Sequence, residues 1–179
     1  MGKRRFKMEA KAKILGHPIH QMLIPFPFGL LATAVIFDII YMIWGNPTFA
    51  LVAFWMMVAG AIGAVIAAPF GLIDWMGIPS ATRAKSVGAM HGIGNVIVLI
   101  LFAVSIYLRY SEARPNYQPD SLAFALSLVG FLIAGVTGWL GGELVDRLSV
   151  GVDDGAHLDA PSSLSNQPAR SHSRAAASK

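Results

Sequence analysis

The sequence contains no cysteine, and it is poor in charge for its length of 179 residues. Without cysteine the chain cannot form disulfides, thiolate metal sites, iron–sulfur clusters or covalently attached haem. Only 13% of the residues are charged and 55% are hydrophobic, whereas a soluble domain carries about 25% charged and about 45–50% apolar residues. These proportions exclude an intrinsically disordered chain and argue against a soluble single-domain enzyme.

Charge is also missing from long stretches of the chain. Between residues 14 and 82 the only ionised side chains are Asp38 and Asp74, and residues 86–108 contain none. No water-exposed surface can be built from such stretches. The sequence also lacks a Gly-rich phosphate loop, a nucleophile elbow and an ordered Ser/His/Asp set. We therefore expect no hydrolase, transferase or nucleotide-binding activity, and a redox carrier is the one catalytic role left to test.

What the sequence does have is long apolar runs. Four windows of about 20 residues, the length that crosses a bilayer, lie at 24–44, 49–73, 87–108 and 122–142. The links between these windows are short, so that neighbouring helices run antiparallel. The sequence therefore predicts an all-α fold, an integral membrane up-down four-helix bundle.

Three segments follow from these runs. Residues 1–13 form a basic N-terminal segment, and residues 14–150 form the four-span membrane domain. Residues 151–179 are rich in Ser, Ala, Asp and Arg. Such a composition cannot bury a core, so we expect this tail to be disordered.

Lysine and arginine are distributed unequally between the two sides of this bundle. With four spans, both termini and the middle link share one side, which holds twelve Lys and Arg residues against two on the other. The positive-inside rule then predicts a multi-pass protein of the cell's inner (plasma) membrane with both termini in the cytoplasm. The basic residues of 1–13 are expected to meet anionic lipid and not nucleic acid.

Six polar residues collect at the cytoplasmic ends of the predicted helices. They are His17, His20, Asp74, His91, Asn95 and Glu143. A four-helix bundle brings its helix ends to within about 10–12 Å of one another. Because polar groups inside a membrane are costly, this one-sided cluster predicts a functional site. Pro25 and Pro27 are expected to break the first helix, which places His20 on a short interfacial piece before the main span.

Small residues recur around the histidine of the third span. Gly88, His91, Gly92 and Asn95 share one helix face. Small-residue ladders also follow the second and fourth spans, at Gly60, Ala64, Ala68, Ala134, Gly138 and Gly142. Such ladders commonly serve close helix packing. The functional alternative is a slot for a flat macrocycle beside a ligating imidazole.

Asp38 stands apart from this cluster, in the outer half of the first span. An unpaired carboxylate there costs about 2.5–3.5 kcal/mol of insertion free energy. We expect Asp38 to be protonated, or paired with a group at the same depth such as Tyr107 or Arg109. An asparagine at this position is then expected to be tolerated.

Several blocks of the sequence resemble a bacterial membrane family, domain of unknown function 2231. The blocks are GHPIH at 16–20, FP at 26–27, FD at 37–38, PFGLIDW at 69–75, G-x-x-H-x-x-x-N at 88–95 and GWLGGELV at 138–145. The resemblance covers about residues 14–152, and it implies four spans without an established activity. Some relatives are joined to redox domains, which favours electron transfer. Some also carry a further histidine where this chain has Pro25.

Electron transfer through haem b is the first of three functions that remain open. The haem would be held by His91 and by His20 or His17, with Asn95 beside it, because imidazole is a standard axial ligand and bundle interiors hold cofactors. Such a carrier implies a redox partner protein.

The other two functions use the same residues differently. A non-haem metal site or an ion path would draw on His17, His20, His91, Asp74 and Glu143, since histidine with carboxylate suits Zn²⁺ or Fe²⁺. A structural or partner-binding protein would need no cofactor. In that case the histidines hydrogen-bond across helices and Asp74 pairs with Arg83.

Overall fold

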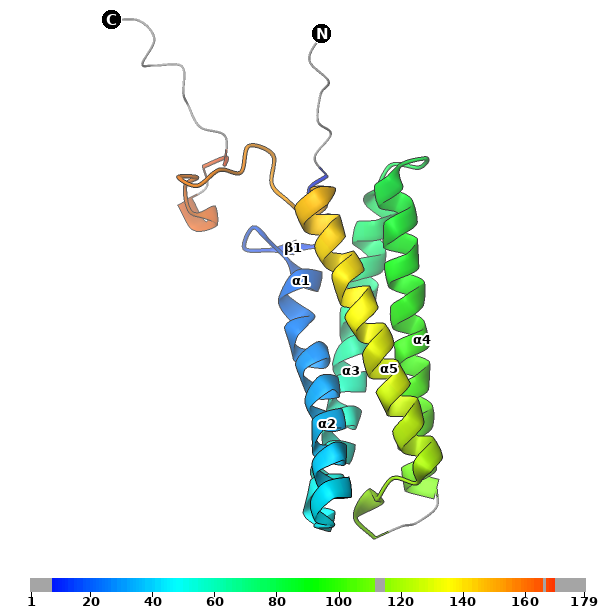
Figure 1. The fold of residues 1–179 in the computed structure, drawn as a ribbon. Helices are drawn as coiled ribbons and strands as arrows, with labels where there is room; N and C mark the ends of the chain where they lie inside the picture. The colour runs from blue at the N-terminus through cyan, green and yellow to red at the C-terminus, as the bar shows by residue number, and fades with distance from the viewer. Residues whose placement is uncertain (1–7, 112–114, 166, 170–179) are drawn as a thin grey trace, which may run out of the picture.

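The computed structural model describes residues 8–111, 115–165 and 167–169 (Figure 1). Its long helices are α2 (Pro25–Trp44), α3 (Pro47–Gly77), α4 (Arg83–Ser111) and α5 (Ser121–Gly142). Its short elements are β1 (Lys13–Ile14), β2 (His17–Pro18), α1 (Ile19–Leu23), the 3-10 turns η1 (Pro115–Tyr117) and η3 (Ser163–Ser165), and the π-helical turn η2 (Glu143–Arg147). Within the described residues, four helical segments are long and apolar enough to cross a membrane. The predicted all-α four-helix fold is confirmed.

Local sequence signals set the helix ends. Gly45 ends α2 in a left-handed conformation, with φ at 68°, which glycine adopts at little steric cost. At the start of α3, the Oδ1 atom of Asn46 accepts a hydrogen bond from the N–H of Thr48 at 3.0 Å. At the start of α5, the Oδ1 atom of Asp120 accepts one from the N–H of Ala123 at 2.7 Å. These caps satisfy N–H groups that lack helical partners and so define where each helix begins.

The first span starts earlier than the sequence predicted. Ile24, between α1 and α2, has helical dihedral angles (φ −56°, ψ −37°). The N–H of Ile24 donates to the His20 carbonyl at 3.1 Å, and the N–H of Phe28 donates to the Ile24 carbonyl at 3.2 Å. Pro25 and Pro27 each remove only their own backbone hydrogen bond, and the helix continues past them. The predicted short helical piece with His20 is present as α1, ahead of α2. The predicted interruption is wrong, because α1 and α2 form one span.

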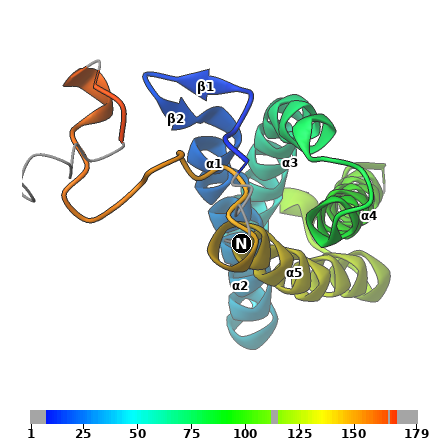
Figure 2. The same ribbon diagram turned by 90° about the horizontal axis from the view of Figure 1, so that it is seen from above.

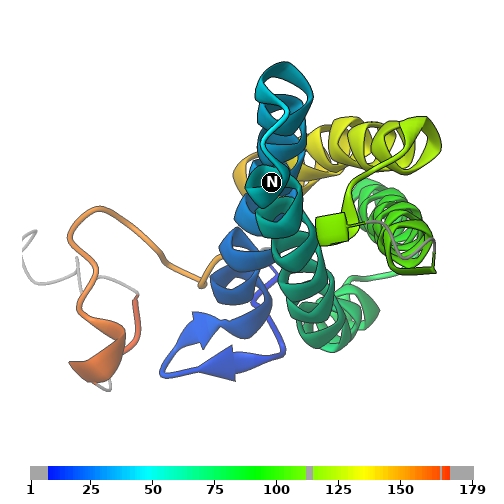
Figure 3. The ribbon, with the colours of Figure 1, turned by 90° about the horizontal axis from the view of Figure 1, so that it is seen from below.

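The long helices pack as two hairpins, α2 with α3 and α4 with α5, and α3 also packs along α4 (Figures 2 and 3). The shared core contains Leu31, Val35, Met57, Val98 and Phe102. Large apolar side chains also cover the outside of the bundle. Among them are Ile36, Trp55, Ile62, Ile93, Ile100, Leu132 and Val136. A helix bundle with such an apolar outer surface is stable when lipid surrounds it, and not when water does.

The two ends of the bundle carry different polar groups. We call one the histidine end: it holds α1, the turn between α3 and α4, and η2. We call the other the arginine end: it holds the turn between α2 and α3, and η1. The first and last described parts of the chain both lie at the histidine end (Figure 1).

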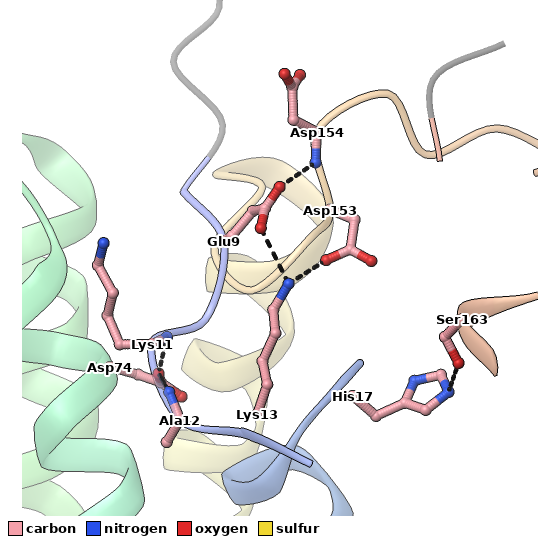
Figure 4. A network of polar contacts seen from close by, with 9 residues as sticks. All are labelled: Glu9, Lys11, Ala12, Lys13, His17, Asp74, Asp153, Asp154 and Ser163. Atoms are coloured by element: carbon pink, nitrogen blue, oxygen red, sulfur yellow. Dashed lines mark hydrogen bonds and ion pairs between the residues drawn. The ribbon is translucent and has the colours of Figure 1, made fainter. Parts of the chain in front are cut away.

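Residues 8–18 and 149–163 meet at the histidine end, and we call them the clasp (Figure 4). Met8 forms a parallel bridge with Val150. The Nζ atom of Lys13 lies 2.5 Å from Oδ1 of Asp153 and 3.0 Å from Oε2 of Glu9. The clasp thus ties the two segments that flank the membrane domain to each other.

The boundaries predicted for these flanking segments stay predictions. Residues 1–7, in the basic segment, lie outside the described residues. The same holds for residues 166 and 170–179 of the tail that is predicted to be disordered.

Candidate functional site

His20 lies in α1, with its ring against α3. Its Nδ1 atom lies 3.0 Å from the backbone carbonyl oxygen of Ala67. Gly71 leaves room for the ring, because a Cβ atom at that position would stand 2.7 Å from Cε1 of His20. A side chain at residue 71 would therefore push the imidazole off its carbonyl partner.

His91 lies in α4 and is held in the same way, by α5. Its Nδ1 atom lies 2.8 Å from the backbone carbonyl oxygen of Thr137. A Cβ atom on Gly141 would stand 3.3 Å from Cε1 of His91, so glycine again makes room for an imidazole. Each histidine thus reaches from one helix to a backbone carbonyl on another.

Asn95 and Thr137 complete a small network around His91. The Nδ2 atom of Asn95 lies 3.2 Å from Nε2 of His91 and donates to the His91 carbonyl at 2.9 Å. The Oγ1 atom of Thr137 lies 2.9 Å from Oδ1 of Asn95 and 3.1 Å from the Ala134 carbonyl oxygen, and these two acceptors share its single proton. The side chain of Asn95 is therefore held from both sides.

The two imidazoles face each other across the bundle. The ring centroids of His20 and His91 are 6.4 Å apart, and the ring planes make an angle of 87°. A carbonyl oxygen only accepts hydrogen bonds, so each Nδ1 must carry a proton. In a neutral ring Nε2 then keeps its lone pair. This arrangement, with Nδ1–H on a backbone carbonyl and Nε2 as the electron donor, is typical of metal-ligating histidines.

The remaining predicted site residues lie elsewhere at the histidine end. His17 is exposed, and its Nε2 atom lies 3.3 Å from Oγ of Ser163 (Figure 4). Asp74 accepts hydrogen bonds from the backbone N–H groups of Lys11, at 2.6 Å, and Ala12, at 3.0 Å. The carboxylate of Asp74 thus anchors the segment that leads into β1.

Glu143 and Arg83 form an ion pair, with Nη2 of Arg83 2.7 Å from Oε1 of Glu143. The expected pairing of Asp74 with Arg83 is therefore wrong. Arg83 is the first residue of α4 and contacts Glu143, which follows α5. Asp74 is hydrogen-bonded to the N-terminal segment instead.

The five residues suggested for a non-haem metal do not come together. Of these, only His20 and His91 face each other. Within the part of the chain that the structure describes, no group of three or more His, Cys, Asp or Glu side chains is arranged to hold a metal ion. The structure thus brings together two imidazoles and one amide, and places the two carboxylates in other contacts.

Thr137, Ala67, Gly71 and Gly141 are parts of this site that sequence reasoning missed. Thr137 is one of few polar residues in the fourth apolar run, and its rarity there was a usable signal. The carbonyl of Ala67 left no signal, because every residue type carries the same backbone group.

The glycines next to His91 in the sequence do not make the space for the His20 and His91 imidazoles. A Cβ atom on Gly88 would stand 2.7 Å from Cδ1 of Trp75, and none of the described atoms lies within 4 Å of one built on Gly92. The glycines that accommodate the imidazoles, Gly71 and Gly141, lie on the opposing helices.

A second buried polar group lies towards the arginine end. The guanidinium of Arg109 binds the Asp38 carboxylate with two hydrogen bonds, Nη1 to Oδ1 at 2.8 Å and Nη2 to Oδ2 at 2.6 Å. Its Nε atom donates to Oγ of Ser105 at 3.3 Å, and that hydroxyl donates to the Ala123 carbonyl at 2.7 Å. Both charged side chains are 0% exposed. The prediction that Asp38 pairs with a group such as Arg109 is confirmed, and the alternative partner, Tyr107, is 65% exposed.

Four apolar helices that enclose a buried ion pair and a half-buried imidazole pair define an integral membrane bundle. Over residues 16–154 the chain matches a family described as predicted membrane protein, DUF2231. The chain belongs to this family, as the resemblance of its sequence blocks predicted. No curated protein and no solved structure gives a significant match.

Proposed function

We propose that this protein is an electron carrier that holds haem b between His20 and His91. The observation that carries the proposal is the pair of facing imidazoles, 6.4 Å apart between centroids, each held through Nδ1 by a backbone carbonyl. Both histidines lie on membrane-spanning helices. An ionisable pair in such a position is a functional-site hypothesis by default.

The separation of the two rings fits one iron between them. A metal–nitrogen bond to imidazole is about 2.0–2.1 Å long, so two rings on opposite sides of one ion have centroids roughly 6 Å apart. In the part of the chain that the structure describes, no third protein ligand joins the pair. A porphyrin supplies the four other nitrogens itself, so two imidazoles suffice for haem whereas most protein-ligated metal ions need three or four side chains.

The protein residues have separate tasks in this proposal. Haem iron supplies reversible one-electron reduction. The carbonyls of Ala67 and Thr137 hold the Nδ1 protons, which fixes the tautomer and makes each Nε2 a better electron donor. Both rings are half-buried between the apolar helices. These features support a redox role and need no group for acid–base chemistry.

An absorption spectrum tests the proposal. The full chain, purified in a mild detergent from cells supplied with a haem precursor, is expected to show a Soret band and to change its spectrum on reduction with dithionite. His91→Ala and His20→Ala are each expected to lower the bound haem at least tenfold. His17→Ala is the matched control, because His17 is an exposed histidine at the same end of the bundle, and it should leave the spectrum unchanged.

Other results would select a different function. A folded protein without a Soret band rejects haem binding, and stoichiometric zinc or iron in that sample would favour the metal or ion-path alternative. If neither haem nor metal is bound, the histidine pair serves helix packing or partner binding. Monodispersity in size-exclusion chromatography shows that each variant is folded.

The proposed orientation places the histidine end in the cytoplasm of a bacterium. Lys11, Lys13, Arg83, Lys85 and Arg147 lie at this end, and Arg109 is buried in its ion pair towards the other end. Reporter fusions after residue 179 and between residues 112 and 120 should report opposite sides of the inner membrane. Fusions that report the same side would overturn the orientation. A redox partner protein would then approach from the cytoplasm.

A further inference from the structure

The two facing histidines differ in how free their second nitrogen is. In the part of the chain that the structure describes, the ring of His20 is hydrogen-bonded only through Nδ1. The ring of His91 is bonded through Nδ1 and also accepts a hydrogen bond at Nε2, from the amide of Asn95 at 3.2 Å. Nε2 is the atom with which His91 would bind a metal. The lone pair needed for ligation is therefore already in use.

Asn95 cannot turn away without losing other contacts. Its Nδ2 atom also donates to the His91 carbonyl at 2.9 Å, and its Oδ1 atom accepts the Thr137 hydroxyl at 2.9 Å. Thr137 thus acts twice: its backbone carbonyl holds Nδ1 of His91, and its hydroxyl holds the amide that occupies Nε2.

We propose that Asn95, held by Thr137, is a clamp that competes with haem iron for the Nε2 lone pair of His91 and so regulates haem affinity. The inference rests on the proposed haem function. Nε2 of His20 can bind iron directly, whereas Nε2 of His91 can bind iron only after the amide of Asn95 is displaced. Asn95 and Thr137 are positioning residues, because each acts through His91.

Substitutions can separate the two roles of Thr137. Asn95→Leu removes the amide and keeps the same branching of the side-chain heavy atoms. Thr137→Val removes the hydroxyl but keeps the backbone carbonyl and the branched shape, whereas Thr137→Ser keeps the hydroxyl. The net strength of one hydrogen bond corresponds to about a two- to tenfold change in affinity.

Titration of haemin into the detergent-purified full chain measures this effect. Asn95→Leu is expected to bind haemin about two- to tenfold more tightly than the wild type. Thr137→Val should shift the affinity in the same direction by less, and Thr137→Ser should match the wild type. Equal or weaker binding by both Asn95→Leu and Thr137→Val, with both variants monodisperse, would overturn the clamp.

A second measurement separates failure of the clamp from failure of haem binding. In haem-free protein with ¹⁵N-labelled histidine, the signals of His91, assigned by comparison with His91→Ala, should show a protonated Nδ1 and a hydrogen-bonded Nε2. Asn95→Leu should move the Nε2 signal and leave the Nδ1 signal in place. An unmoved Nε2 signal overturns the clamp whatever haemin does. A moved signal without a Soret band in any variant overturns the haem function and shows the hydrogen bond of the clamp directly.

Discussion

The Asp38–Arg109 pair and the His20–His91 pair lie towards opposite ends of one bundle, and they differ in what they leave unsatisfied. Arg109 and Asp38 neutralise each other, and both carboxylate oxygens accept hydrogen bonds from the guanidinium. The histidines are bound mainly to backbone carbonyls of other helices. The ion pair is therefore a complete contact that joins α2 to α4. In the imidazole pair, Nε2 of His20 has no hydrogen-bond partner among the described residues, and Nε2 of His91 contacts only the Asn95 amide.

This difference teaches how buried polar groups in a membrane bundle can be interpreted. A charge without its partner is very costly in an apolar interior, so a complete ion pair is explained by structure alone. A neutral imidazole is far less costly, and one of its nitrogens can be left for chemistry. We infer that the arginine end holds the bundle together and that the histidine end carries function.

The largest effect is expected from breaking the ion pair. Arg109→Met or Asp38→Leu leaves one buried charge without its partner, and each should lower the free energy of unfolding by about 3–5 kcal/mol. The double variant should recover most of this loss, because no charge remains. Denaturant unfolding in detergent micelles measures these values.

Arg83→Met is the control for this comparison. It breaks the Arg83–Glu143 pair, in which the arginine side chain is 61% exposed, and a surface pair contributes at most about 1 kcal/mol. If Arg109→Met lowers the free energy of unfolding no more than Arg83→Met does, the buried ion pair does not stabilise the bundle. Asp38→Asn also leaves the charge of Arg109 uncompensated, so the structure replaces the expectation that it is tolerated with one of destabilisation.

An intermediate effect is expected from filling the space around the imidazoles. Gly71→Ala places a Cβ atom 2.7 Å from His20, and Gly141→Ala places one 3.3 Å from His91. Overpacking of this kind costs about 1–3 kcal/mol, and Gly71→Ala should be the worse of the two. Haem content should fall in the same order. Gly135→Ala is the matched control, because no described atom lies within 4 Å of its added methyl group.

The glycine series sharpens the comparison because it changes the histidine end alone. Thermal unfolding and the Soret absorbance of each variant can be measured on the same sample. A loss of stability without a loss of haem would show that the rings are packing elements. Equal behaviour of all three variants would show that the two imidazoles have no fixed positions.

The smallest effect concerns the clasp, outside the membrane. Burial lowers the pKa of Lys13, but the hydrogen bonds to Asp153 and Glu9 outweigh it and hold that pKa above its ordinary value of 10.5. A raised folded-state pKa means that Lys13 stabilises the clasp fully below pH 10.5 and that this contribution is lost as the pH rises through the folded value. The clasp should therefore loosen only in alkaline solution.

The absence of native cysteine makes this prediction easy to check. Spin labels at Leu15→Cys and Leu158→Cys, both exposed positions, report the distance between the two halves of the clasp. The distance distribution should broaden at alkaline pH, and Lys13→Met should broaden it at neutral pH. If neither alkaline pH nor Lys13→Met changes the distance distribution, Lys13 does not hold the two halves of the clasp together.

Much of the fold could be predicted because membrane insertion leaves a strong sequence pattern. A span must be apolar along its whole length, so the windows at 24–44 and 122–142 lie within the helices observed. The exception is the first span, whose start depends on how a helix accommodates Pro25 and Pro27. Proline predicts a break, but the hydrogen bonds on either side of the two prolines decided the outcome.

The candidate site could be predicted only in part. From their positions along the spans, six polar residues could be assigned to the histidine end. That end is wide enough for these residues to make several separate contacts. Asp74 accepts hydrogen bonds from backbone N–H groups of the N-terminal segment, and Glu143 pairs with Arg83. His17 lies in the clasp beside Ser163. Helix rotation and the course of the flanking segments settled these partners, and neither has a signature in one sequence.

By itself the sequence determined the class of protein, the number of spans and the end of the bundle to which each polar residue belongs, because hydropathy and helix rise are local properties of the chain. Only the tertiary structure decided that His20 faces His91, that Arg109 reaches Asp38, and that Asn95 occupies a histidine nitrogen. The first two contacts depend on which faces of separate helices meet. The third lies within α4, and the Asn95 side chain contacts Thr137 of α5. Because almost every face of these helices is apolar, the hydrophobic pattern could not specify those faces, and packing around glycines and backbone carbonyls did.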